Sequence, residues 1–246
     1  MIIGSDLVYF EELTSTNSHA SLMLKEGLTA EGCVLLTDFQ TSGKGRAGNR
    51  WESERGKNLL ISIILYPKFI RPEDQFFISM AISLGICDFA DNYIGGSKIK
   101  WPNDIYINDD KIAGILIENS ILGGTLENTI AGIGLNINQV EFPSSVPNPV
   151  SLSIITGKEY DRGVCLEQLL ACLDFRYEQL SSGKLKELEN EYLSRLYWLN
   201  KWHYYRSEER LFRGMIRGIS ANGRLIIEEE NGKAAEFYFK EVEYIR

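Results

Sequence analysis

A short segment rich in glycine and cationic residues carries the clearest chemistry in the sequence. Between Thr41 and Trp51 the chain places three glycines, one lysine, two arginines and a tryptophan. Glycine permits positive φ and close backbone approach to a ligand, and lysine and arginine donate to carboxylate or phosphate oxygens. The tryptophan that ends the segment can cover a flat ring. This composition predicts a flexible anion-binding lid, with a solvated basic surface loop as the alternative.

Three later segments hold more polar groups than packing requires: Lys100–Asp104, Lys111–Glu118 and Gly132–Asn138. The first reads Lys-Trp-Pro-Asn-Asp, and its last two side chains offer the hard oxygen ligands that Mg²⁺ prefers. An ordinary Pro-Asn-Asp turn has the same pattern. Lys111 opens an apolar strand, either as a solvated strand end or as a cation aimed at a carboxylate or phosphate.

Two common nucleotide-binding motifs are missing from the sequence. The segment Gly132-Ile-Gly134 lacks the third glycine of a dinucleotide loop, and no helical pattern follows it. Gly43-Lys44-Gly45 is not part of a GxxxxGK[ST] phosphate loop. Any nucleotide site must therefore be built in another way.

A run of helix-capping residues, Thr14–Asn17, precedes a helical pattern that extends to about Glu26. One helix needs one such cap, so we expect some of these side chains to face a ligand. The buried strand that follows delivers Gln40 to the mouth of the glycine-rich loop.

Charge and composition exclude several functional classes. The formal net charge is −8 and the pI is about 5.0, so no broad basic face for nucleic acid is expected. From Gln40 to Lys57, however, five cations oppose two anions, which favours a small anionic ligand. The four cysteines form no CxxC pair and lie among apolar neighbours, which predicts free thiols in a reducing compartment.

The remaining composition indicates a cytoplasmic protein. The two histidines have no acidic or thiol neighbours that would suggest a metal or catalytic site. We find neither a secretory leader nor an apolar stretch long enough to cross a membrane.

These segments must be positioned by a mixed α+β domain followed by a small β domain. Short apolar strands are predicted at 7–13, 32–40, 58–66, 105–107, 111–118 and 128–138, and a helix packed on two sides from Pro72 to about Tyr93. Two amphipathic helices follow. From Leu199 onward, short strands and two Asn-Gly turns predict hairpins. We therefore expect a catalytic domain at 1–198 and a small β-barrel at 199–246.

Taken in order, the polar segments resemble one family, the biotin protein ligases. The glycine-arginine loop of that family resembles Gly43–Trp51, and its Lys-Trp-Pro-Asn-Asp segment resembles Lys100–Asp104. Its Lys-x-x-Gly-Ile-Leu-x-Glu and Gly-x-Gly-x-Asn-x-Asn segments stand at Lys111–Glu118 and Gly132–Asn138. Ser15-Thr16-Asn17 and Gln40 also match. The resemblance implies a mixed-sheet catalytic domain related to class II synthetases and a C-terminal SH3-like β-barrel.

The resemblance implies a two-step reaction. The carboxylate of biotin attacks the α-phosphate of ATP to give biotinyl-5′-AMP, and a lysine of a biotin carboxyl carrier domain then attacks this adenylate. Mg²⁺ is the implied cofactor. Some family members form homodimers, which the sequence does not decide here. Members that double as repressors carry an added DNA-binding domain, and we expect a short form without it.

The resemblance also implies roles for individual residues. Lys111 and Arg46 are the expected catalytic cations, and Asp104 is the expected Mg²⁺ ligand or a guide for the acceptor lysine. The nucleotide is expected to meet Arg46, Trp51, Asn103, Lys111 and Asn136. Biotin is expected to meet Ser15, Thr16, Asn17, Gln40, Gly43, Lys44, Gly45, Arg46, Lys111 and Gly114.

The sequence departs from the family pattern in the glycine-rich loop, and two alternative functions remain open. Many members have arginine where this chain has Lys44, and further arginine where it has Ala47 or Asn49. Lysine keeps the charge and loses the planar fork, so we expect weaker retention of the adenylate. A lipoate or octanoate ligase is the nearest rival enzyme, and a non-catalytic biotin-binding module is the rival of another class.

Overall fold

The fold is built on a seven-stranded mixed sheet. A computed structural model describes residues 1–27 and 29–245, apart from the side chain of Ala47. The strand order is β1-β2-β3-β7-β6-β5-β4. Only β1 and β2 pair in parallel; the other neighbours are antiparallel. The strands are β1 (Asp6–Leu13), β2 (Cys33–Gln40), β3 (Leu59–Leu65), β4 (Ser97–Lys100), β5 (Asp104–Ile107), β6 (Asp110–Leu122) and β7 (Thr125–Leu135).

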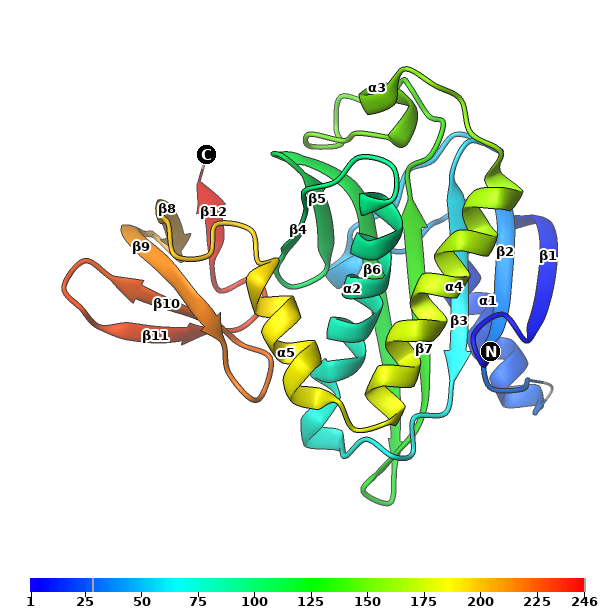
Figure 1. Cartoon of the computed structure of the whole chain (residues 1–246), viewed down its shortest axis with the longest axis horizontal. Helices are drawn as coiled ribbons and strands as arrows, with labels where there is room; N and C mark the ends of the chain where they lie inside the picture. The colour runs from blue at the N-terminus through cyan, green and yellow to red at the C-terminus, as the bar shows by residue number, and fades with distance from the viewer. Residues whose placement is uncertain (28, 246) are drawn as a thin grey trace.

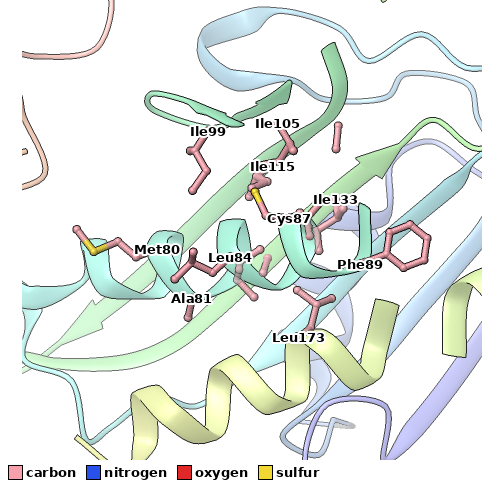
Figure 2. Close-up of a cluster of buried hydrophobic side chains, with 14 of the residues drawn as sticks. Met80, Ala81, Leu84, Cys87, Phe89, Ile99, Ile105, Ile115, Ile133 and Leu173 are labelled. Carbon is pink, nitrogen blue, oxygen red and sulfur yellow. The ribbon is translucent and has the colours of Figure 1, made fainter. Parts of the chain in front are cut away.

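Helices cover both faces of this sheet (Figure 1). On one face lies α2 (Phe76–Asp91), which is backed by α4 (Arg162–Ser181) and α5 (Leu185–Ser194). The buried side chains of α2 meet strand residues such as Ile115 and Ile133 on one side and Leu173 of α4 on the other (Figure 2). This confirms that the helix is packed on two sides. The opposite face of the sheet carries the shorter α1 (Thr16–Glu26) over a smaller apolar cluster.

The register of the three central strands places their polar and glycine residues on the α1 face. Successive strand residues point to opposite faces. Ser62 of β3 pairs with Gly132 of β7, which pairs in turn with Leu116 of β6. Gly134 and Gly114 are likewise partners. The motif glycines therefore form a flat patch beside the N-terminus of α1.

The C-terminal strands form a separate five-stranded antiparallel sheet of order β11-β10-β9-β8-β12. Its members are β8 (Trp202–Ser207), β9 (Arg210–Ile219), β10 (Leu225–Glu229), β11 (Ala234–Phe237) and β12 (Glu243–Ile245). This confirms the predicted hairpins. Closure into a barrel stays a prediction, because no pairing joins β11 to β12 within residues 1–27 and 29–245. The division into domains at residue 198 likewise stays a prediction.

Other sequence expectations are met with small differences. Pro72 starts a short 3-10 turn, Pro72–Asp74, and α2 begins two residues later. A short helix, α3 (Leu152–Thr156), follows the proline-rich loop and was not predicted; Ser151 caps it by accepting from the backbone N–H of Ile154. All four cysteines are free. Within the described ranges, every helix is too short or too polar to span a bilayer.

Candidate functional site

One cavity of about 730 Å³ collects most of the predicted site residues. It lies on the α1 face of the large sheet and reaches the C-terminal sheet. Twelve predicted residues line it: Ser15, Thr16, Asn17, Gln40, Lys44, Gly45, Arg46, Trp51, Asn103, Asp104, Lys111 and Gly114. Gly43 and Asn136 are not part of its wall.

The floor of the cavity depends on three glycines. A Cβ on Gly134 would stand 2.7 Å from Cδ2 of Trp51, and one on Gly114 would stand 2.8 Å from Cζ3 of the same indole. A Cβ on Gly132 would overlap the amide of Asn17. Contacts this close are not found between real side chains. The Gly-x-Gly pattern therefore makes room for an indole and an amide, and it serves no dinucleotide.

Uncharged polar groups form one wall at the start of α1. Ser15 is the N-cap residue by position, yet its side chain makes no capping hydrogen bond. The first helical N–H and the hydroxyl of Thr16 instead donate to Oε1 of Gln40, at 2.7 Å and 3.2 Å. Because Gln40 supplies the cap, the hydroxyl of Ser15 is available to the cavity. This agrees with the expectation that not all capping-type residues here serve the helix.

Asn17 takes part in a buried hydrogen-bond network that was not predicted from the sequence. Its Oδ1 accepts from the hydroxyl of Ser62 at 2.6 Å, and its Nδ2 donates to Glu118 at 2.7 Å and to the carbonyl of Leu116 at 3.3 Å. The Asn17 amide is thus held at the cavity edge by protein partners. Ser62 is the one polar residue in an otherwise apolar strand, and that exception was the available signal.

The glycine-rich loop is a small hairpin. Trp51 N–H donates to the carbonyl of Gly43, and Gly45 N–H donates to that of Asn49. A bridge between Lys44 and Arg50 closes it. A Cβ on Gly43 would meet the backbone oxygen of Trp51 at 2.5 Å, so this glycine permits the strands to approach. Lys44 and Asn49 are exposed at the cavity, and the side chain of Ala47 lies outside the described residues.

Arg46 at the hairpin tip points across to the C-terminal sheet. Its guanidinium lies 4.3 Å from the ring centroid of Phe239. Burial lowers the pKa of Arg46, and the nearby Tyr192 opposes this effect only in part. No carboxylate of the described residues forms an ion pair with Arg46. Its charge is therefore not neutralised by the protein.

Lys111 and Asp104 form the charged pair at the centre. The Nζ of Lys111 lies 2.6 Å from Oδ1 of Asp104 and 5.5 Å from the ring centroid of Trp51. Both side chains are about three-quarters buried, since 25% and 23% of their surfaces are exposed. No cluster of three metal-ligating residues occurs in the described chain. One carboxylate fits Mg²⁺ that arrives with substrate phosphates, because that ion takes few protein ligands there.

Asn136 lines an adjoining cavity of about 700 Å³, together with Trp51, Lys111 and Asp104. Its Nδ2 donates to the carbonyl of Val150 at 3.0 Å. Its Oδ1 is buried and accepts no hydrogen bond. An unmatched buried acceptor is costly, so this oxygen is poised for a donor on a ligand.

The C-terminal sheet contributes wall residues that no local sequence pattern indicated. Phe239 and Tyr244 both line the main cavity. Lys100, predicted only as part of a motif, lies between Tyr244 and Tyr106 of β5: its Nζ is 4.9 Å from the ring centroid of Tyr244 and 3.2 Å from the hydroxyl of Tyr106. Their participation depends on long-range packing and could not be read from spacing.

This arrangement can hold a ligand with an uncharged polar head and an anionic tail. The polar wall of Ser15, Thr16 and Gln40 faces such a head, and Lys111 and Arg46 can neutralise the tail. The adjoining cavity offers an indole and an unmatched acceptor for a flat, donor-bearing ring.

Comparison with known proteins agrees with this geometry. Residues 9–136 match the model of the Biotin/lipoate A/B protein ligase family. The biotin–[acetyl-CoA-carboxylase] ligase of Paracoccus denitrificans is 31% identical over 240 residues, which cover 92% of this chain and 97% of the relative. The bifunctional ligase/repressor BirA of Bacillus subtilis is 30% identical over 237 residues, which cover 94% of this chain and 72% of the relative.

Solved structures give the same result. The biotin protein ligase of Aquifex aeolicus in complex with biotin and ATP superposes with a TM-score of 0.81 at 28% identity, over 98% of this chain and 99% of that one. Its apo structure gives a TM-score of 0.76 at 26% identity, with the same coverage.

Fold and cavity together define a protein ligase of the biotin/lipoate class, and the chain belongs to the Biotin/lipoate A/B protein ligase family. Within that family, the named relatives that match along most of this chain are biotin ligases.

Proposed function

We propose that this enzyme activates biotin with ATP and transfers it to a lysine of a biotin carboxyl carrier domain. One observation carries the proposal: a single cavity sets an uncharged polar wall at Ser15, Thr16 and Gln40 against the cations Lys111 and Arg46. Biotin has a neutral ureido ring at one end and a carboxylate at the other. The two ends of the ligand match the two walls.

In the first step the carboxylate oxygen of biotin bonds to the α-phosphorus of ATP, and diphosphate leaves with the electron pair of the broken P–O bond. Two anions must meet, so positive charge near the reacting atoms stabilises the transition state. Lys111 serves this role at the centre of the cavity and Arg46 at its edge. Asp104 holds the Lys111 ammonium in place through the 2.6 Å ion pair.

The adenine ring belongs in the adjoining cavity. Its exocyclic amino group can donate to the unmatched Oδ1 of Asn136, and its flat face can lie on Trp51. Asn103 is fixed near the phosphates by two hydrogen bonds with the backbone of Ile115. Mg²⁺ bound to the phosphates and to Asp104 would neutralise charge on the α-phosphate.

In the second step the acceptor lysine amine attacks the carbonyl carbon of the adenylate, and AMP leaves as the C–N bond forms. The incoming ammonium must lose a proton. Two carboxylates of the described residues line the cavity, Asp104 and Glu243, and Asp104 is the one that lies beside Lys111. The Gly43–Trp51 hairpin closes one side of the cavity. We infer that its ordering excludes water from the reactive anhydride.

The test combines the purified chain with ATP, Mg²⁺, biotin and a carrier domain, followed by mass measurement of the carrier. Gain of one biotinyl group supports the proposal. Lys111→Ala should abolish the gain, whereas Lys98→Ala, a lysine of β4 outside the cavity, should retain it. Full activity of Lys111→Ala would remove the principal assignment. Carrier modification with lipoate in place of biotin would support the rival ligase.

We further infer that the reaction takes place in the cytoplasm, because four free thiols suit a reducing compartment. Self-association through the large sheet, as the family resemblance implies for some members, is a second inference. Sedimentation of the chain with and without biotin measures it.

A further inference from the structure

A second cavity of about 360 Å³ adjoins the main one. The two share a wall formed by Arg46, Asn103 and Phe239. Its far side comes from one face of α2 and from the turn at 222–224 of the C-terminal sheet. The steps proposed above use none of these distal residues.

Positive charge dominates this second cavity. Arg46 has no acidic partner within the described ranges, as noted above. Arg224 stacks on Tyr238, with its guanidinium 3.8 Å from the ring centroid, and its Nη2 donates to the hydroxyl of that tyrosine. Its Nη1 lies 3.8 Å from Glu236, at the limit of an ion pair, and its buried Nε has no hydrogen-bond partner. Among the described residues that form the wall, Glu73 is the only one with a carboxylate. It pairs with Arg71 at 3.2 Å, and 58% of its side chain is exposed.

A buried hydroxyl completes the wall opposite the arginines. Phe76, Ser79 and Ser83 follow one another at helical spacing on the face of α2 that lines the cavity. Ser83 is 0% exposed, and its Oγ has no hydrogen-bond partner. A buried hydroxyl without a partner is unfavourable, and this one belongs to the cavity wall, where it can donate a hydrogen bond.

Arg224 is fixed in position by its turn. The indole Nε1 of Trp101 donates to the carbonyl of Gly223 at 2.9 Å. Gly223 has φ of +78°, and a Cβ there would stand 2.6 Å from the ring of Phe76. The turn is therefore held against both the Lys100–Asp104 segment and α2, and Arg224 leaves it directly into the cavity wall.

We propose that this second cavity binds the β- and γ-phosphates of ATP and retains the diphosphate that they become, with Arg224 and Ser83 as its ligands together with Arg46. The inference rests on the proposed function. When the bond from the α-phosphorus to the bridging oxygen breaks, that oxygen keeps the electron pair. The departing diphosphate thus gains charge where two guanidinium groups and a hydroxyl can donate to it.

Biotin-dependent exchange of labelled diphosphate into ATP by the full chain tests the proposal. Arg224→Gln should raise the KM for diphosphate about tenfold or more, because a charge-assisted contact is lost. The KM for biotin should stay unchanged. Ser83→Ala should raise the diphosphate KM by a smaller factor without lowering Tm. The control is Arg217→Gln, on the same sheet but paired with Glu228 outside the cavity.

Calorimetric titration with inorganic diphosphate separates the two ideas. If the wild type shows no biotin-dependent exchange, the proposed function is wrong. If the wild type nevertheless binds diphosphate and Arg224→Gln does not, the assignment of the second cavity as a diphosphate site is still supported. Wild-type values for both exchange and binding in Arg224→Gln and Ser83→Ala would overturn the assignment of this site.

Discussion

The indole of Trp51 lies directly against the backbone of Gly134. A Cβ on that glycine would stand 2.7 Å from Cδ2 of the indole, and a Cβ on the neighbouring Gly114 would stand 2.8 Å from Cζ3 of the same ring. The indole of Trp51, on which adenine is proposed to lie, can adopt this orientation only because Gly134 and Gly114 have no side chains. Trp51 reaches this position because the hairpin returns it to the sheet through its hydrogen bond to Gly43.

Gly134→Ala should displace Trp51 and weaken ATP binding by about tenfold or more, with a loss of stability of about 1–3 kcal/mol from overpacking. Calorimetry with ATP and thermal unfolding measure the two effects. In a Trp51→Ala background, Gly134→Ala should lower the free energy of unfolding much less, because the indole with which the new Cβ clashes is gone. An equal loss of stability in both backgrounds would show that contact with the indole is not what requires glycine at position 134.

Ser62→Ala should lower the free energy of unfolding by about 1–3 kcal/mol, since it leaves the buried Oδ1 of Asn17 without its donor. Biotin affinity should fall with it, because Asn17 would no longer be held at the cavity edge. Urea unfolding and biotin titration check both. Ser83→Ala is the matched control: its hydroxyl has no protein partner, so its removal should leave unfolding unchanged or shifted upward. Equal losses in the two variants would contradict this account.

Lys44→Arg should slow dissociation of biotinyl-5′-AMP several-fold, because the planar fork of arginine forms two parallel bonds to an oxyanion. Lys44 is exposed at the cavity and bridges to Arg50 in the hairpin. A chase of labelled adenylate gives the rate. Lys57→Arg, whose lysine pairs with Glu159 at 3.7 Å outside the cavity, serves as control. An unchanged rate in Lys44→Arg would speak against the family departure as a cause of weak retention.

Acid should destabilise the interface between α2 and the segment after α5. Burial alone would raise the pKa of Asp91, but hydrogen bonds from Arg195 and Ser97 outweigh it and hold that pKa below its usual range. Because its pKa is lower in the folded state than in the unfolded state, the Asp91 carboxyl stabilises the fold at neutral pH, and this contribution is lost as pH falls below about 4 through the folded-state pKa. Unfolding of wild type and Asp91→Asn between pH 7 and about pH 3 should converge in acid. A constant difference would refute the linkage.

Much of the large sheet was predictable because local patterns and topology agree. The apolar run 58–66 gives β3 within one residue, and the turn at Asn108–Asp110 gives the start of the β5–β6 hairpin, although β6 runs four residues beyond its predicted end at Glu118. On the α1 face, Ser15, Thr16 and Asn17 were predicted because a single helix needs only one cap, whereas Ser62, a polar exception within an apolar strand, was missed. Contacts such as Arg46 with Phe239 did not, because they join segments almost two hundred positions apart through packing alone. The helix at Leu152–Thr156 was missed since five residues carry too little periodicity.

The hydrogen bond from Trp101 to Gly223 has a consequence for protein engineering. Its acceptor is a backbone carbonyl, so this bond does not require a particular side chain at the turn, and glycine is needed there because a Cβ would clash with Phe76. A chimera that exchanges this sheet for a relative's should therefore keep the turn glycine, together with the apolar side chains in and beside the sheet, such as Ile216 and Val242, that belong to the main core. Residue 224 can then be varied in such a chimera. On the proposal above, this should change the release rate of diphosphate and leave the biotin wall at Ser15, Thr16 and Gln40 unchanged.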